Sequence, residues 1–469
     1  MRAVLPLFFL FLGGLPGAAR AQAPPMDFSG PFRIAGIAIE GNRITKPRVI
    51  LRELLLSEGD TVTSKDLYAR IERSTQNLRN LSLFNSVGIM PLFLGPNEVF
   101  LTVTVNERWY WWPEPIFRVA DPNFNTWWLT RDLRRVNFGA YLNRYNFRGR
   151  NETLYVKFQL GYTKELAMRY RIPFVDRKER WGFSIGGGYA EQNEVTVATR
   201  DNKRVFARYE QEEVRTERKV ELQASLRKAH DIRHGWRLAF VHADVRDTVR
   251  RATGDYFRNN ASDSRYLALG YTFSIDRRDS RVFPLKGHYT EFRFDRLGLG
   301  LLGSAEPRVT ILQAHVERLA QLKPRWSVGG SLRARTTLDR DLPYYNQEGL
   351  GYSNNVRGYE YYIVDGQHAA VGKANVLFAL VQPREYYLNP IPLEAFRTLY
   401  VAVYLHAFVD AGYAWDDRYA AQNPLANTVL TGTGVGLDLV SSYDQVLRLE
   451  YSVNGRSETG LYLHFNQPF

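Results

Sequence analysis

Segments of about ten residues in which apolar and polar side chains alternate fill the chain from Trp109 to its end. In residues 326–337, for example, Val328 and Leu332 share one face and Arg333 lies on the other. This period of two predicts β-strands. Strands that carry charge on one face are typical of a transmembrane β-barrel, in which that face lines a wet lumen. A soluble β-sandwich also alternates, but the many arginines on strand positions favour the membrane.

Walking along this region, we count about sixteen strands, an even number as bacterial barrels require. We therefore expect a mainly β fold with a 16-stranded antiparallel transmembrane barrel at residues 109–469. The expected strand centres are Phe117, Phe138, Val156, Arg169, Ile185, Leu222, Phe240, Leu269, Phe292, Leu312, Leu332, Val376, Val403, Val435, Leu449 and Leu463.

The segments between these strands fall into short and long classes. Short turns, such as Asn146–Arg150 and Gln321–Arg325, are expected on the periplasmic side, and longer polar stretches, such as Thr248–Ser264 and Asp339–Gln367, on the outside. The charged segment Gln192–Arg218 fits either a long loop or strands that extend above the membrane.

A different pattern covers residues 32–108, where helical spacing interrupts the alternation. A strand is expected at 32–40, two helices follow it, and strands at 84–94 and 99–106 complete the segment. The order strand, helix, helix, strand, strand predicts a small α/β domain in front of the barrel.

The N-terminus has the organisation of a secretory signal peptide at residues 1–21. Arg2 supplies the positive charge, an apolar run follows, and Ala19-Arg20-Ala21 is a cleavage site of the A-x-A type. A membrane anchor is the alternative, but the apolar run is too short for one. Residues 22–31 are then a linker to the α/β domain.

Composition supports an exported barrel. Hydrophobic residues make up 45% of the chain and aromatic residues 14%, and no apolar stretch is long enough for a transmembrane helix. The chain has no cysteine, which suits an oxidising compartment. The net charge of +13 fits arginines and lysines that line a polar lumen and loops. It also fits attraction to anionic lipid head groups or acidic substrates. We expect no nucleic-acid partner.

Catalytic and metal-binding signatures are weak. The eight histidines are scattered, with no H-E-x-x-H motif. His242 with Asp244, and His230 with Asp231, are fragments that a catalytic set could use, but polar positions on a barrel surface explain them better. We therefore expect no enzyme activity, no catalytic residues, no metal and no cofactor.

The segment 32–108 resembles a POTRA domain. The resemblance rests on "IEGNRITKPRVILREL" at its front, "LRNLSLFNSVGI" in its middle and "LTVTVNER" at its end. It implies that Leu83 and Phe84 pack in the domain core. It also implies that an exposed sheet edge pairs with unfolded polypeptide. The strand Val99–Val105 is one candidate for that edge, although the sequence does not reveal which strand is free.

Four barrel segments resemble motifs of the BamA/TamA superfamily of outer-membrane assembly and translocation proteins. "NNVRGYE" (354–360) resembles a loop motif that folds into the lumen, and "FVDAG" (408–412) resembles its strand partner. "GTGVGLDL" (432–439) and "IDRRDSRVFPLKG" (275–287) are the other two. The resemblance places the POTRA domain in the periplasm and the barrel in the outer membrane, and makes this a short member with one POTRA domain.

These motifs suggest a latch that holds the loop inside the barrel. A buried guanidinium needs an acidic partner, and a bidentate pair between Arg357 and Asp410 would supply one. Two groups of residues would complete the site. The latch comprises Arg357, Gly358, Tyr359, Asp410 and Gly412, and the loop would sit against Gly432, Gly434, Gly436 and Asp438, with Asp438 as a second anchor.

The C-terminal sequence "SETGLYLHFNQPF" resembles the sorting signal of outer-membrane barrels, carried by Gly460, Leu463, Phe465 and Phe469. A barrel closes when its last strand pairs with its first. Pro468 has no N–H to donate, so we expect pairing to fail there and the closing seam to be weak.

The resemblance implies that the protein assembles barrel proteins into the outer membrane or moves a polypeptide across it. Its expected partners are outer-membrane lipids, unfolded polypeptide bound by the POTRA domain, and periplasmic chaperones or lipoproteins. A passive pore or surface antigen is one alternative, because a fold does not fix a function. Lipid transfer to the outer membrane is another, and a separately encoded passenger such as a lipase is also compatible with the sequence.

Overall fold

The computed structural model describes residues 31–119, 131, 133–209, 213–339, 342–352 and 354–465. The expected signal peptide at 1–21 and residues 22–30 of the linker lie outside the described residues. Within the described part of the chain, no helix is both long and apolar enough to cross a membrane.

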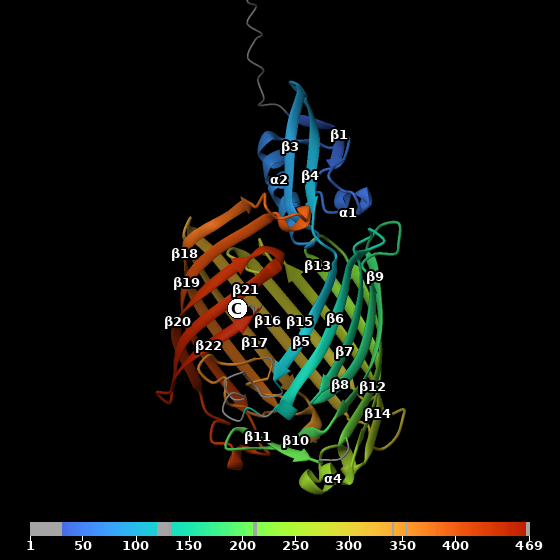
Figure 1. The fold of residues 1–469 in the computed structure, drawn as a ribbon, viewed down its shortest axis with the longest axis vertical. Helices are drawn as coiled ribbons and strands as arrows, with labels where there is room; N and C mark the ends of the chain where they lie inside the picture. The colour runs from blue at the N-terminus through green and yellow to red at the C-terminus, as the bar shows by residue number, and fades with distance from the viewer. Residues whose placement is uncertain are drawn as a thin grey trace, which may run out of the picture.

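A 16-stranded antiparallel sheet, rolled into a barrel, makes up most of the molecule (Figure 1). The prediction of a sixteen-stranded barrel behind a small α/β domain is confirmed, and each expected strand centre falls inside a different strand. The strands are β5 (Trp111–Val119), β6 (Val136–Phe147), β7 (Glu152–Gly161), β8 (Thr163–Ile172), β9 (Trp181–Gln192), β12 (Arg215–Arg227), β13 (Ile232–Val245), β14 (Asp263–Asp276), β15 (Gly287–Leu297), β16 (Val309–Lys323), β17 (Trp326–Thr337), β18 (His368–Tyr387), β19 (Thr398–Trp415), β20 (Leu430–Ser441), β21 (Gln445–Asn454) and β22 (Thr459–Phe465).

Alternation along the strands separates an apolar outer wall from a polar interior. Ile185, Leu222 and Leu238 are register partners on neighbouring strands and remain exposed on the outer face. Glu221 and Arg237, on the same strands, take the inner positions and form an ion pair across the sheet. An outer belt of large apolar side chains matches the hydrocarbon layer of a membrane.

The barrel sheet ends at β5 on one side and at β22 on the other. Every other neighbouring pair of barrel strands has a defined register, but among the described residues no hydrogen-bonded register joins β5 to β22. Pro468 and Phe469 lie outside the described residues. The expectation that pairing fails at Pro468 therefore stays a prediction.

The N-terminal domain is a four-stranded sheet covered by two helices. Its elements are β1 (Phe32–Glu40), α1 (Pro47–Leu51), β2 (Thr61–Val62), α2 (Ser64–Arg79), β3 (Phe84–Gly95) and β4 (Glu98–Glu107). The side chain of Thr63 accepts a hydrogen bond from the backbone N–H of Asp66 and so caps α2. The two-residue strand β2 was not predicted, because two residues are too few for a periodic signal.

The sheet order β2-β1-β4-β3 corrects the expected free edge. The strand Val99–Val105 belongs to β4, which pairs with β1 on one side and β3 on the other. The long free edge is therefore β3. Pro91 in β3 agrees with this position, because proline is tolerated on an edge strand where an N–H is not needed for pairing.

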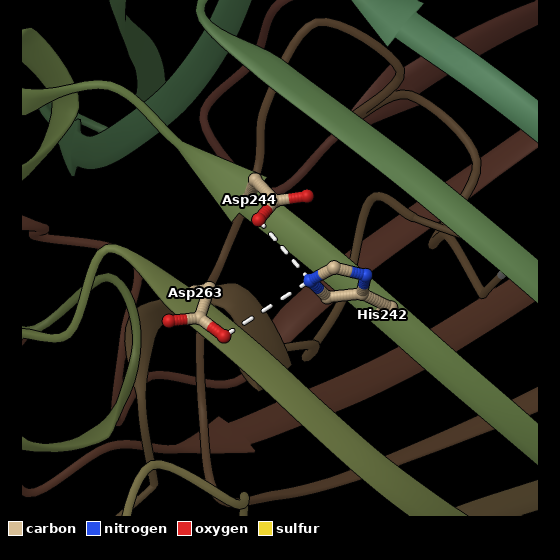
Figure 2. A group of neighbouring side chains, drawn as sticks. All are labelled: His242, Asp244 and Asp263. Atoms are coloured by element: carbon tan, nitrogen blue, oxygen red, sulfur yellow. Dashed lines mark ion pairs between the residues drawn. The ribbon is translucent and has the colours of Figure 1, made fainter.

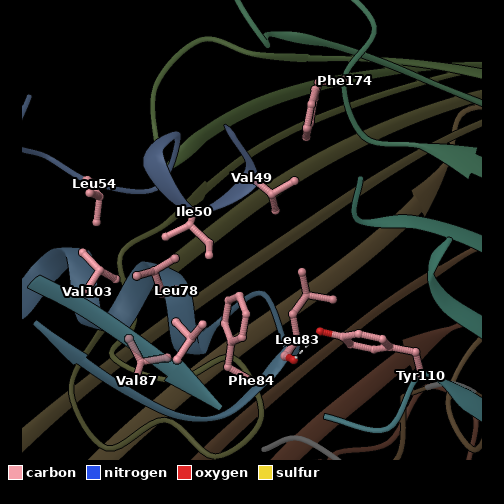
Figure 3. Close-up of a cluster of buried hydrophobic side chains, with 11 residues drawn as sticks. Val49, Ile50, Leu54, Leu78, Leu83, Phe84, Val87, Val103, Tyr110 and Phe174 are labelled. Atoms are coloured by element: carbon pink, nitrogen blue, oxygen red, sulfur yellow. Dashed lines mark hydrogen bonds between the residues drawn. The ribbon is translucent and has the colours of Figure 1, made fainter. Parts of the chain in front are cut away.

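The N-terminal domain packs directly on one end of the barrel (Figure 1). Its core includes Leu83 and Phe84, and Phe174 from the turn between β8 and β9 joins the same cluster (Figure 3). The buried carboxylate of Glu53 forms two hydrogen bonds, of 2.5 and 2.6 Å, with Arg227 at the end of β12. Arg108 forms a bidentate pair with Asp444 between β20 and β21, at 2.9 and 3.0 Å.

Loops close much of the opposite end of the barrel. The segment Gln192–Arg218, which the sequence left open, contains a separate hairpin of β10 (Glu194–Arg200) and β11 (Lys203–Arg208). This hairpin lies beside α4 (Asp247–Thr253) at that end (Figure 1). Side chains of both elements and Tyr344 share one buried apolar cluster. Short 3-10 turns are η1 (Leu133–Arg135), η2 (Arg258–Asn260), η3 (Tyr344–Asn346), η4 (Glu394–Phe396), η5 (Ala420–Gln422) and η6 (Ser442–Asp444).

Candidate functional site

The described residues of the segment between β17 and β18, at 338–339, 342–352 and 354–367, fold back into the barrel. Its Leu350 and Val364 form an isolated antiparallel bridge, so the segment has internal structure. Val356 and Tyr359 pack against Leu430 of β20 in one buried cluster. A loop that carries its own pairing and apolar contacts is a fixed part of the interior.

Arg357 at the tip of this loop lies against Asp410 of β19. Its Nε and Nη2 donate to the two carboxylate oxygens at 2.8 and 2.6 Å. The backbone N–H of Arg357 adds a third hydrogen bond to Asp410, at 3.1 Å. The guanidinium also lies over the ring of Phe408, 3.7 Å from its centre. The structure thus brings together the two residues on which the sequence-based latch depends.

A second carboxylate completes the surroundings of Arg357. Nη1 donates to Glu450 of β21 at 3.0 Å. Arg357, Asp410 and Glu450 are all nearly fully buried. Burying charges is costly unless each is paired and hydrogen-bonded. Two carboxylates around one guanidinium leave an extra negative charge, so further cations are needed nearby.

Basic side chains of neighbouring strands lie beside these carboxylates. His406 of β19 lies 3.0 Å from Glu450 and 2.9 Å from Asp438. Arg448 pairs with Asp438 at 2.6 Å, and His464 of β22 lies 3.2 Å from Glu450. The network therefore connects the loop tip to the last four strands, including β22 at the seam.

Sequence reasoning missed Glu450 and His406 as parts of this network. Glu450 belongs to the polar face of an alternating strand, which was the only available signal. The partner of such a residue depends on the register of several strands, and a single sequence does not reveal that register.

Two glycines in the site allow the loop to approach the wall. A Cβ on Gly432 would lie 1.8 Å from the carbonyl oxygen of Arg357, and one on Gly412 would lie 2.4 Å from Val356. Gly358 has a φ of +92°, and its carbonyl oxygen accepts a hydrogen bond from Asn454 at 2.9 Å. Glycine is favoured at each position because a side chain would clash or be strained.

Three other residues that we expected to hold the loop contact other parts of the barrel. Gly434 and Gly436 make room for the rings of Phe408 and His406 rather than for the loop. Asp438 does not contact Arg357, because it lies six residues beyond Gly432 on β20 and pairs with Arg448 directly across the sheet. A strand rises about 3.3 Å per residue, so this separation is about 20 Å.

The expected C-terminal signal lies on β22. Leu463 and Phe465 are exposed on the outer face at 55% and 67%, as a membrane-facing strand requires. Gly460 pairs with Ser452 of β21. Phe469 lies outside the described residues.

The motif at residues 275–287 forms the connection between β14 and β15, next to the N-terminal domain. Arg278 pairs with Asp276 at 2.9 and 3.1 Å and with Glu317 at 3.0 Å. The side chain of Asn80, in the N-terminal domain, accepts from the backbone N–H of Arg281. The motif thus joins the barrel to that domain.

His242, Asp244 and Asp263 form a cluster on the outer face of β13 and β14 (Figure 2). These three side chains are of types that bind metals, and no metal site was expected from the sequence. His242 lies 3.1 Å from Asp244 and 4.0 Å from Asp263. However, Arg218 and Arg265 contact the two ring nitrogens of His242 at 3.5 and 3.2 Å. Two guanidinium groups repel a further cation, so the arrangement favours a surface ion-pair network.

The second candidate fragment, His230 with Asp231, lies beside the N-terminal domain. His230 contacts the backbone oxygen of Arg52 at 3.0 Å, and Asp231 pairs with Arg277. Both side chains thus make contacts that hold the structure together.

Comparisons with known families agree with this architecture. A model described as the Omp85 superfamily domain matches residues 146–466. The chain belongs to the Omp85 superfamily. The POTRA model, described as a surface antigen variable number repeat, matches residues 32–108. No curated protein matches the chain.

Two solved structures share the fold. The first is BamA from Haemophilus ducreyi lacking POTRA domains 1-3, at 13% identity and a TM-score of 0.52, with 92% of this chain and 83% of that chain covered. The second is CdiB from Escherichia coli, at 14% identity and a TM-score of 0.52, with 92% and 75% covered.

Membership of the superfamily locates the protein. The barrel lies in the outer membrane and the single POTRA domain in the periplasm. The turns beside the POTRA domain are therefore periplasmic, and the β10–β11 hairpin lies at the extracellular end. At the family level the chain is an outer-membrane insertase or translocator, and barrels of this superfamily are typically assembly or transport proteins rather than enzymes.

Proposed function

We propose that this protein moves a polypeptide across the outer membrane or inserts barrel proteins into it, and that β3 of the POTRA domain receives the substrate. The free edge of β3 is the observation that carries the proposal. An unpaired strand edge offers N–H and C=O groups to any extended chain.

The side chains of β3 add to this edge. Met90, Leu92 and Leu94 are exposed at 72%, 58% and 57% on one face of the strand. Three alternate apolar residues match the spacing of side chains in a bound extended peptide. The periplasm contains no nucleotide, so the energy would come from pairing and burial in the folding substrate.

The contacts inside the barrel favour a channel that the loop closes over a pore that is always open. The loop at 338–367 is held by Arg357 and by an apolar cluster. Asn202 of the β10–β11 hairpin hydrogen-bonds to Ile363 of this loop and to the segment at 420–429. We propose that Arg357 and Asp410 form a latch that keeps the loop in place between transport events, and that Gly358, Gly412 and Gly432 give it room.

Crosslinking tests the substrate edge. The chain has no cysteine, so single cysteines can be placed without background. Leu92→Cys on β3 should crosslink to unfolded polypeptide in the periplasm, whereas Tyr68→Cys on α2, which is also exposed, should not. Equal crosslinking at both positions, or none at either, contradicts the proposal.

Depletion identifies the substrate class. Quantitative proteomics of the outer membrane and medium should show many barrel proteins falling together if the protein is an insertase. A fall in one secreted or surface protein would identify a dedicated translocator. If no protein falls, translocation is the wrong function, and channel conductance and lipid transfer should be measured instead.

A further inference from the structure

A large cavity lies inside the barrel beneath the POTRA domain. Its volume is about 1030 Å³, and it lies between β8, β9, β12, β13, β14 and β15. Arg52, Glu53, Asn80 and Leu81 of the POTRA domain form its periplasmic side. We call this cavity the chamber. It is separate from the proposed latch, whose residues do not line it.

The chamber wall is strongly basic. Among the described residues, nine arginines and three carboxylates line it. The carboxylates already have partners, since Glu53 pairs with Arg227, and both Glu221 and Asp295 pair with Arg237. The nine arginines are Arg52, Arg169, Arg171, Arg180, Arg227, Arg233, Arg237, Arg281 and Arg293.

Five of these guanidinium groups make no ion pair or hydrogen bond within the described part of the chain. They are Arg52, Arg169, Arg171, Arg180 and Arg233. Arg169 and Arg171 occupy successive inward positions of β8, and Arg233 lies on the inner face of β13. The unpaired charges therefore converge from two walls and from the POTRA side.

Gathering unpaired cations in one cavity is unfavourable. Like charges repel, and the low polarity of a barrel wall screens them less than bulk water does. Water in the lumen relieves part of this cost. A compact anion with several charges would relieve more, because each guanidinium presents a planar fork of donors that matches phosphate oxygens.

We infer that the chamber binds a ligand that carries two or more phosphate groups, either free in the periplasm or as the head group of a lipid. The volume exceeds what a single phosphate needs, and five unpaired arginines exceed the charge of one phosphate. This inference does not depend on the proposed transport function.

Binding to the purified full chain tests the inference. The protein is titrated in a non-ionic detergent with inorganic pyrophosphate, by calorimetry at constant ionic strength. In a second arm, cardiolipin, which has two phosphates, is added to the micelles and its binding is followed by native mass spectrometry against phosphatidylcholine. We expect one molecule bound in at least one arm. Arg171→Gln with Arg233→Gln should weaken that binding about tenfold or more.

A matched variant separates the chamber from general charge. Arg118→Gln with Arg333→Gln removes two charges from inward strand positions outside the chamber and should change affinity less than about twofold. Both variants are first checked for heat-modifiable mobility in SDS gels. If the chamber variant does not fold, Arg171→Lys with Arg233→Lys keeps the charge but loses the forks, and should still weaken binding measurably.

The outcomes separate the sources of phosphate. Binding of pyrophosphate alone assigns a free phosphate compound, and binding of cardiolipin alone assigns a lipid head group. Binding of both supports the shared chemistry. The inference is wrong if neither binds, if the two double variants lose affinity equally, or if polyglutamate binds where neither phosphate compound does. That last result would assign the chamber to acidic polypeptide.

Discussion

Two regions of the barrel interior differ in how their charged side chains are paired. Around the loop at 338–367, Arg357 lies between two carboxylates, and His406, His464 and Arg448 contact the same network of acidic groups. In the chamber, five arginines have no acidic partner among the described residues. The first arrangement satisfies its charges internally and holds a loop. The second leaves charge unsatisfied and is suited to bind something that the chain itself does not supply.

The largest effect on stability and activity should come from substituting Arg357, at the centre of the paired network. Arg357→Ala leaves Asp410 buried without its partner, which typically costs about 3–5 kcal/mol. We expect the loop to leave the lumen and transport activity to fall while the barrel stays folded. Proteolysis of the loop and mobility in SDS gels at room temperature measure the two effects.

Arg456→Ala is the control for that variant, because Arg456 is about half exposed and pairs only at the surface. If Arg357→Ala loses its resistance to SDS at room temperature, the pair is needed for the barrel fold itself, and a latch that opens during work is the wrong interpretation. Arg357→Ala with Asp410→Ala should recover part of the lost stability.

Glu53 and Arg227 line the chamber, but they form an ion pair, as the charged residues around Arg357 do. Burial alone would raise the pKa of Glu53, but hydrogen bonds and the charge of Arg227 lower it below the ordinary value of 4.5. A carboxyl whose pKa is lowered by docking stabilises the docked state above about pH 4.5. That contribution is lost as the pH falls through the lowered pKa.

Acid should therefore weaken the contact between the POTRA domain and the barrel at Glu53, while the Arg108–Asp444 pair still holds the joint. Spin labels at Tyr68→Cys and Leu322→Cys, both on exposed sites, should report a longer or broader distance distribution at low pH. Glu53→Gln should give the broadened distribution already at neutral pH, whereas Glu98→Gln, in an exposed pair of the same domain, should not. An unchanged distance at low pH would show that other contacts dominate the docking.

A smaller effect is expected from adding a side chain at Gly432, where the loop tip packs against β20. Gly432→Ala places a methyl group against the carbonyl of Arg357 and should cost about 1–3 kcal/mol through overpacking. Gly330→Ala is the control, since its nearest neighbour would lie at 3.5 Å, an ordinary contact distance. Unfolding temperatures of the two variants in detergent give the comparison, and equal values would mean that the loop tip yields easily.

The smallest expected effect concerns the unpaired arginines of the chamber. Thr272→Glu places a carboxylate directly across the sheet from Arg293 and near Arg233. It should stabilise the protein by up to about 1 kcal/mol. It should also reduce pyrophosphate binding, because the new carboxylate competes for the same donors. A drop in stability would indicate that the chamber charges are already well satisfied by water.

Most of the fold could be predicted from the sequence, because a period of two persists in every barrel strand and each expected centre lies in its own strand. The POTRA order was predicted as well, apart from the two-residue β2. The position of β3 at the edge was not, because sheet order depends on pairing between segments far apart in the chain. The β10–β11 hairpin was left open for the same reason, since charged loop residues and extended strands look alike.

For the site, the motif resemblance identified Arg357 and Asp410, and the structure places them in contact. Their wider setting could not be predicted. Glu450 and His406 become neighbours through the register of β19, β20 and β21. The arginines of the chamber come from strands that are separate in sequence, and the net charge of +13 indicated only that such a surface could exist.

The join between the POTRA domain and the barrel has a mechanical consequence. Only residues 108–110 separate β4 from β5. Arg108 is fixed to Asp444, and Tyr110 is buried in the domain core. Such a short, packed joint cannot bend freely, so the POTRA domain acts as a stiff lever arm of about 40 Å along β3. A force on the far end of β3 is delivered to β5, one of the two strands at which the barrel sheet ends.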